Sequence, residues 1–174
     1  MISPGYQQPQ ISPAPILIIG IGNEYRGDDG IGPAIARRLR ERHLSAVTIL
    51  EISGDLMDIW EKCQGAETVI LVDAAASGGK PGTLYRFEAH REPLPQKLFA
   101  PSSTHALGLA AAVELARALK LLPATLIVYG LEGKSFASGQ GLSPEVQQAL
   151  PGLMEEILQD LKEKCRATLG PRGT

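Results

Sequence analysis

Runs of branched apolar residues alternate along this chain with segments in which apolar residues recur every three or four positions. The runs predict strands, and the recurring positions predict amphipathic helices. The expected strands cover residues 16–21, 47–52, 68–73 and 125–130. Strands that are apolar throughout are typical of a parallel sheet covered on both faces. The pattern therefore predicts an α/β fold, a three-layer sandwich whose twisted, mostly parallel sheet of about five strands carries helices on both faces.

The expected helices lie between and after these strands. They cover residues 30–43, 55–64, 105–122 and 143–165. In the first, Ile31, Ile35 and Leu39 recur at intervals of four, and arginines supply the solvated face. The last opens with Ser143-Pro144-Glu145, a helix cap, a preset first turn and an acid suited to the positive end of the helix. Pro151 is expected to restart or kink this helix.

One segment breaks the alternation of strands and helices. Residues 82–89 follow the 68–73 strand too closely for a crossover helix, so they are expected to form an antiparallel edge strand.

A chain of 174 residues is long enough for one stable core. We expect a flexible N-terminal extension over residues 1–15, a single domain over residues 16–166 and a flexible tail over residues 167–174.

Composition excludes several classes of function. Seventeen basic and nineteen acidic residues give a net charge of −2, and the basic residues form no stripe for nucleic acid. Cys63 and Cys165 lack the paired spacing of a zinc site or a disulfide framework, which favours a reducing cytoplasm. The first fifteen residues carry no positive charge and no long apolar run, unlike a signal peptide or a membrane anchor. We expect a cytoplasmic monomer that uses neither nucleic acid nor a membrane.

Three residues with metal-binding side chains stand where an α/β fold presents them together. Asp29 follows the first strand, Asp73 ends a buried strand, and His105 opens a helix. In such folds, the carboxyl ends of parallel strands and the starts of the following helices meet at one edge of the sheet. Two carboxylates and one imidazole would form an incomplete metal shell, with positions left for another ligand. The sequence therefore predicts a functional metal site at this edge.

Each of these residues also has a purely structural interpretation. Asp28 and Asp29 fit a turn and a helix N-cap, Asp73 fits a strand cap, and His105 fits a donor to loop carbonyl groups. An acid at the end of an apolar strand is costly if it is buried alone, so for Asp73 the functional interpretation and the strand cap have equal weight. A thiol nucleophile at Cys63 is an alternative chemistry, but its apolar neighbours favour a packed core thiol.

The glycines after the first strand invite a comparison with dinucleotide-binding proteins. Gly20-Ile21-Gly22-Asn23 begins like that fingerprint, but the position of its third glycine is taken by Tyr25. Two carboxylates at the helix entrance would also repel a pyrophosphate. Nucleotide binding stays only as an alternative.

Residues 20–32, GIGNEYRGDDGIG, resemble the N-terminal signature of the hydrogenase maturation endopeptidases. Later landmarks follow in the family's order and extend the resemblance from about Ile16 to Leu161. Val72-Asp73-Ala74 is similar to the second acid strand, and Ser103-Thr104-His105 to the histidine segment. Leu142-Ser143-Pro144-Glu145-Val146 is similar to the entry of the C-terminal helix.

The resemblance implies an endopeptidase that removes a C-terminal extension from the nickel-loaded precursor of a nickel–iron hydrogenase large subunit. Asp29, Asp73 and His105 correspond to the family's metal-binding and catalytic trio, and nickel, supplied by the precursor, is the implied cofactor. Nickel either activates water or the scissile carbonyl, with an aspartate as base, or only positions the tail. A chaperone that docks the precursor without cleaving it is the alternative function.

Overall fold

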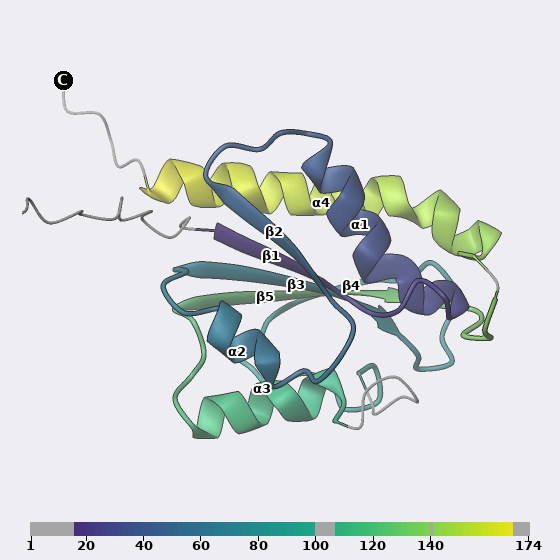
Figure 1. Ribbon diagram of the computed structural model, residues 1–174, viewed down its shortest axis with the longest axis horizontal. Helices are drawn as coiled ribbons and strands as arrows, with labels where there is room; N and C mark the ends of the chain where they lie inside the picture. Colours follow the sequence, from purple (N-terminus) through teal and green to yellow (C-terminus); the bar gives the residue numbers. More distant parts are fainter. Residues whose placement is uncertain (1–15, 100–106, 140, 169–174) are drawn as a thin grey trace, which may run out of the picture.

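A five-stranded sheet forms the middle layer of the molecule in the computed structural model, which describes residues 16–99, 107–139 and 141–168 (Figure 1). The strands are β1 (Ile16–Ile21), β2 (Val47–Ile52), β3 (Thr68–Ala75), β4 (Leu84–Glu88) and β5 (Thr125–Glu132). Their order across the sheet is β2-β1-β3-β5-β4, with β4 antiparallel to β5 and the other pairs parallel. This arrangement confirms the predicted fold class and the antiparallel edge strand.

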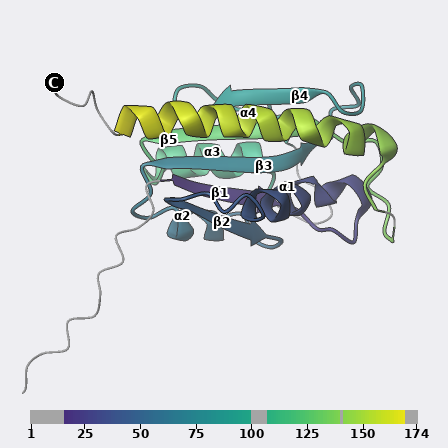
Figure 2. The same ribbon diagram turned by 90° about the horizontal axis from the view of Figure 1, so that it is seen from above.

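Helices cover both faces of the sheet. Helices α1 (Ile31–Arg40) and α4 (Pro144–Thr168) lie on one face, and α2 (Asp58–Lys62) and α3 (Leu109–Ala118) lie on the other (Figure 1). Figure 2 shows α4 running along the β4–β5 side of the sheet and α1 lying towards the β1 side. Neighbouring residues of one strand enter different cores: Ile70 packs beneath α1 and α4, whereas Leu71 packs beneath α2 and α3. The alternation follows from the two-residue period of a strand.

Two strands are longer than their apolar runs. β3 continues past Asp73, and β5 continues past Gly130, because Ala74 pairs with Leu131 and Ala75 with Glu132. The predicted ends at residues 73 and 130 were therefore wrong by two residues each. Asp73 lies inside the β3–β5 ladder, where it pairs with Gly130.

Helices α1, α2 and α3 are shorter than their sequence patterns predict. A short 3-10 helix, η1 (Gly27–Gly30), precedes α1. α2 begins late because Asp55 Oδ1 accepts a hydrogen bond of 2.9 Å from the Met57 N–H, which holds a turn in place of the helix. α3 stops at Ala118, and Lys120 then adopts a φ of 57°.

The C-terminal helix is continuous. α4 spans 25 residues with Pro151 inside it, so it does not restart there. The expected N-terminal extension, residues 1–15, and residues 169–174 of the expected tail lie outside the described residues. Among the described helices, none combines the length and apolarity needed to cross a membrane.

Glycines of the β1–α1 region allow the helix to approach the sheet backbone. A Cβ on Gly20 would lie 2.2 Å from the Gly32 carbonyl oxygen, and a Cβ on Gly32 would lie 2.2 Å from the Ile21 carbonyl oxygen. No side chain fits at these distances. Close packing therefore accounts for both glycines without a bound nucleotide.

We expect Gly32→Ala to lower the free energy of unfolding by about 3 kcal/mol or more, because the added methyl group meets only backbone atoms. Gly152→Ala is the matched control: Gly152 lies in α4 with open space around it, so alanine should stabilise the chain by about 0.5–1 kcal/mol. Urea unfolding of the three proteins measures both changes. A Gly32→Ala variant as stable as the wild type would contradict the packing argument.

Candidate metal and catalytic site

The edge of the sheet brings Asp29 and Asp73 together. Gly20 of β1 pairs with Val72 of β3, so Asp73 lies level with the last residue of β1. Gly22, with a φ of 134°, turns the chain there, and a Cβ at this position would lie 1.9 Å from the Asp29 carbonyl oxygen. Only glycine permits this approach, which folds η1 over the end of β1. Asp29 Oδ2 accepts a hydrogen bond of 2.9 Å from the Asn23 N–H.

Burial and the nearby charge of Asp29 set the protonation of Asp73. Asp73 is 7% exposed and Asp29 is 6% exposed. Burial, and next the negative charge of Asp29, raises the pKa of Asp73 to about 8, although a hydrogen bond from the Ala74 N–H acts in the opposite direction. At neutral pH, Asp73 therefore holds a proton that a nearby cation would displace.

His105, the third predicted ligand, lies outside the described residues. The structure thus brings together the two predicted acids and leaves the position of the histidine untested. Within the described ranges, no three His, Cys, Asp or Glu side chains form a group that would hold a metal ion.

Asp28 has a different environment from its neighbour. Its carboxylate is fully buried and accepts four hydrogen bonds: from the backbone N–H groups of Lys134 (2.7 Å), Ser135 (3.1 Å) and Ser143 (2.7 Å), and from the Ser143 hydroxyl (2.8 Å). These bonds tie η1 to the connection between β5 and α4. The N-cap of α1 is Gly30, without a side-chain hydrogen bond. The N-cap interpretation of the acidic pair was therefore wrong, and Asp28 is a structural clamp.

Another buried carboxylate at this edge, that of Glu132, was not predicted. Glu132, at the end of β5, is fully buried and accepts hydrogen bonds from the Ser77 N–H and hydroxyl, both 2.8 Å, and from the Gly79 N–H at 3.1 Å. It fixes the loop between β3 and β4. The only signal in the sequence was an acid at the end of an apolar run, the same signal that selected Asp73.

Cys63 does not belong to this site. It follows α2, is 5% exposed and packs in the core beneath α2 and α3. Burial raises the pKa of its thiol to about 12. A thiol that stays protonated at neutral pH is a poor nucleophile, so the interpretation as a core residue is confirmed.

Comparison with known proteins gives a consistent answer. A family model described as hydrogenase maturation protease matches residues 33–160. The hydrogenase 2 maturation protease of Escherichia coli is 28% identical over 151 residues, which are 85% of this chain and 91% of that protein. Protein FrxA of Pyrococcus furiosus is 32% identical over 140 residues, 79% of this chain and 98% of that protein.

Solved structures agree with the sequence matches. The hydrogenase maturating endopeptidase HybD from E. coli superposes with a TM-score of 0.70 at 28% identity, covering 86% of this chain and 93% of that one. A NiFe hydrogenase maturation protease, HycI from Thermococcus kodakarensis, superposes with a TM-score of 0.66 at 27% identity and the same coverage. The matched residues of the family model include Asp73 and begin four residues after Asp29.

Proposed function

Because this chain belongs to the hydrogenase maturation protease family and is therefore a peptidase, we propose that it removes a C-terminal extension from the nickel-loaded precursor of a nickel–iron hydrogenase large subunit. In this proposal, nickel already bound to the precursor is the feature that the enzyme recognises. The observation that carries the proposal is the buried pair of Asp29 and Asp73 at one edge of the sheet, where burial and repulsion raise the pKa of Asp73 to about 8.

The chemistry of the proposed ligands suits a substrate-held nickel ion. A cation between two adjacent carboxylates relieves their repulsion and favours the ionised form of both. His105 would add an imidazole, which binds nickel in its neutral form. Thiolates of the precursor would complete the shell. Asp29, Asp73 and His105 are thus proposed as both the metal-binding and the catalytic residues, and they would hold nickel only while the precursor is bound.

The direct test is cleavage of a defined precursor. The purified chain is incubated with nickel-loaded and nickel-free large-subunit precursor, and the products are weighed by mass spectrometry. We expect loss of a C-terminal peptide from the nickel-loaded precursor alone. Equal cleavage of both precursors would contradict nickel recognition. A stable complex without any loss of mass would favour the chaperone alternative.

The same assay tests the residues. We expect Asp29→Ala, Asp73→Ala and His105→Ala each to reduce the cleavage rate by at least about 100-fold, as loss of a catalytic group does. Circular dichroism confirms that each variant is folded. Normal cleavage by all three folded variants would show that the site lies elsewhere.

A further inference from the structure

Asn23, in the loop between β1 and η1, has no part in the proposed reaction but contacts one of its residues. Its backbone N–H donates to Asp29 Oδ2 at 2.9 Å. Asp29 is 6% exposed, and a hydrogen bond from a fixed donor to a buried carboxylate restricts how that carboxylate turns. The orientation of Asp29 therefore depends on the direction of the Asn23 N–H.

The side chain of Asn23 folds the loop into a turn. Asn23 Oδ1 accepts a hydrogen bond of 2.9 Å from the Tyr25 N–H, which is the bond of an Asx turn. The Asn23 carbonyl oxygen accepts a second bond, of 3.1 Å, from the Arg26 N–H and closes a β-turn over residues 23–26. The side chain and the main chain of Asn23 thus stabilise the same turn.

The residue before Asn23 makes this turn important. Gly22 has a φ of 134° and, without a Cβ, imposes few limits on the peptide group that follows it. The Gly22 N–H donates to the Ile52 carbonyl oxygen at 2.9 Å, which ties Gly22 to the end of β2. The peptide group that carries the Asn23 N–H is therefore held by β2 on one side and by the 23–26 turn on the other.

Side-chain packing contributes little to the turn. The Tyr25 side chain is 74% exposed. Glu24 forms an exposed ion pair with Arg37, and such pairs add little stability. The Gly139 N–H donates to the Tyr25 carbonyl oxygen at 3.0 Å, which holds the outer end of the turn. The hydrogen bond to Asn23 Oδ1 is therefore a main determinant of the shape of the turn at its inner end.

We propose that Asn23 is a positioning residue that acts through Asp29. Its side chain closes the turn, the turn directs the Asn23 N–H, and this N–H holds the Asp29 carboxylate in the orientation that meets the nickel of the precursor. The step from Asn23 to Asp29 rests on the hydrogen bonds, and the step from Asp29 to nickel rests on the proposed function. Groups that orient a metal-binding side chain typically contribute about 10- to 100-fold to metal binding or activity.

Cleavage kinetics with the nickel-loaded precursor test the second step. Asn23→Ala removes the side-chain acceptor and keeps the backbone N–H, and we expect it to lower kcat/KM by about 10- to 100-fold. Asn23→Ser is the conservative variant, because a serine hydroxyl also accepts an N–H from two residues further on. It should recover most of the lost rate.

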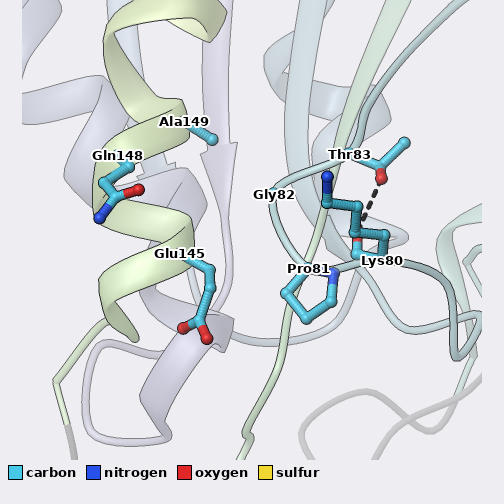
Figure 3. A pocket seen from close by; sticks show the side chains of 7 residues that line it. All are labelled: Lys80, Pro81, Gly82, Thr83, Glu145, Gln148 and Ala149. Atoms are coloured by element: carbon cyan, nitrogen blue, oxygen red, sulfur yellow. Dashed lines mark hydrogen bonds between the residues drawn. The ribbon is translucent and has the colours of Figure 1, made fainter.

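A second turn at the same edge of the sheet provides the matched control. The Thr83 N–H donates to the Lys80 carbonyl oxygen at 3.1 Å, and the Thr83 hydroxyl donates to the same oxygen at 2.6 Å, the bond dashed in Figure 3. This turn leads into β4, two strands away from β3. Thr83→Val removes its side-chain bond. We expect Thr83→Val to lower the urea midpoint about as much as Asn23→Ala does, and to keep the wild-type kcat/KM.

Amide hydrogen exchange, measured by NMR on the free protein, tests the first step without a precursor. After correction for the intrinsic rates of the two residue types, the amide at position 23 should exchange at least about tenfold faster in Asn23→Ala than in the wild type. Asp29→Ala, which removes the acceptor, should accelerate the same amide. Thr83→Val should leave it unchanged. Equal protection in Asn23→Ala and the wild type would overturn the proposal.

The two measurements separate this proposal from the proposed function. If exchange is faster but Asn23→Ala cleaves the precursor as well as the wild type does, Asn23 is not a positioning residue, and the proposed function stands. Equal losses of cleavage in Asn23→Ala and Thr83→Val would also contradict the proposal, because both would then reflect a general loosening of the edge. If the wild type cleaves no precursor, the proposed function fails, and faster exchange still supports the hold of Asn23 on Asp29.

Discussion

Asp73→Asn is expected to abolish precursor cleavage and, at the same time, to make the free protein more stable at alkaline pH. The pKa of Asp73 is raised to about 8, first by burial and then by the charge of Asp29. Between the ordinary pKa of an aspartate, about 4, and this value, the folded chain binds a proton that the unfolded chain releases. The free energy of unfolding therefore falls as pH rises through this window, by at most about 1.4 kcal/mol per pH unit.

Asparagine removes this pH dependence without changing the shape of the side chain. It keeps an oxygen that accepts the Ala74 N–H and has no proton to lose. Between pH 6 and pH 8.5, the Asp73 contribution should cost the wild type about 2–3 kcal/mol, and the asparagine variant should avoid this loss. Urea unfolding at the two pH values measures the difference, with Glu155→Gln as a control on the exposed face of α4. Identical pH slopes for the wild type and Asp73→Asn would overturn the assignment.

If Asp73→Asn stabilises the free protein and abolishes cleavage, Asp73 lowers the stability of the folded chain but is required for activity. A buried acid next to a second acid is unfavourable in the free chain, and it becomes favourable only when a cation is supplied. In the proposed reaction, the precursor supplies that cation. The instability of the empty site would then favour the nickel-loaded precursor over the nickel-free one, because only the former relieves it.

The sequence predicted the fold well where the pattern is local. β1 and β2 have the predicted bounds because their apolar runs stop at Gly22 and Ser53. β3 and β5 were predicted too short, since an acid at position 73 and a glycine at position 130 resemble strand ends. The last two residues of β3 and β5 are in strands because they pair with each other. The local sequence of either strand does not show which strand lies beside it.

The site was predictable from topology, but its supporting contacts were not. A sheet with this order of elements places Asp29 and Asp73 at one edge, as the sequence indicated. The distinct roles of Asp28 and Asp29 could not be predicted, because the donors to Asp28 lie 106 to 115 residues further along the chain. The same holds for Glu132, whose donors come from the loop after β3.

Replacing each of the two neighbouring aspartates by alanine is expected to affect different properties: stability for Asp28 and cleavage for Asp29. Asp28→Ala leaves the donors of Lys134, Ser135 and Ser143 without their acceptor. A buried donor without a partner costs about 1–3 kcal/mol, and partial entry of water should bring the total loss of stability to about 3–5 kcal/mol. Asp29→Ala loses the bond from Asn23 but also removes the repulsion on Asp73, so it should lose less stability than Asp28→Ala.

Urea unfolding and precursor cleavage, measured on the same preparations, distinguish these roles. Asp29→Ala should stay folded and lose cleavage. Asp28→Ala should unfold at a lower urea concentration and lose cleavage only in proportion to its unfolded fraction and to the displacement of η1. Ser143→Ala, which removes a single hydroxyl donor to Asp28, provides a graded control with an expected loss of about 1 kcal/mol. Wild-type stability in Asp28→Ala would show that other contacts hold the β5–α4 connection, and wild-type cleavage by Asp29→Ala would exclude Asp29 from the site. Loss of stability in Asp28→Ala and loss of cleavage in Asp29→Ala would assign a structural role to the first residue and a functional role to the second, although the two are adjacent in sequence.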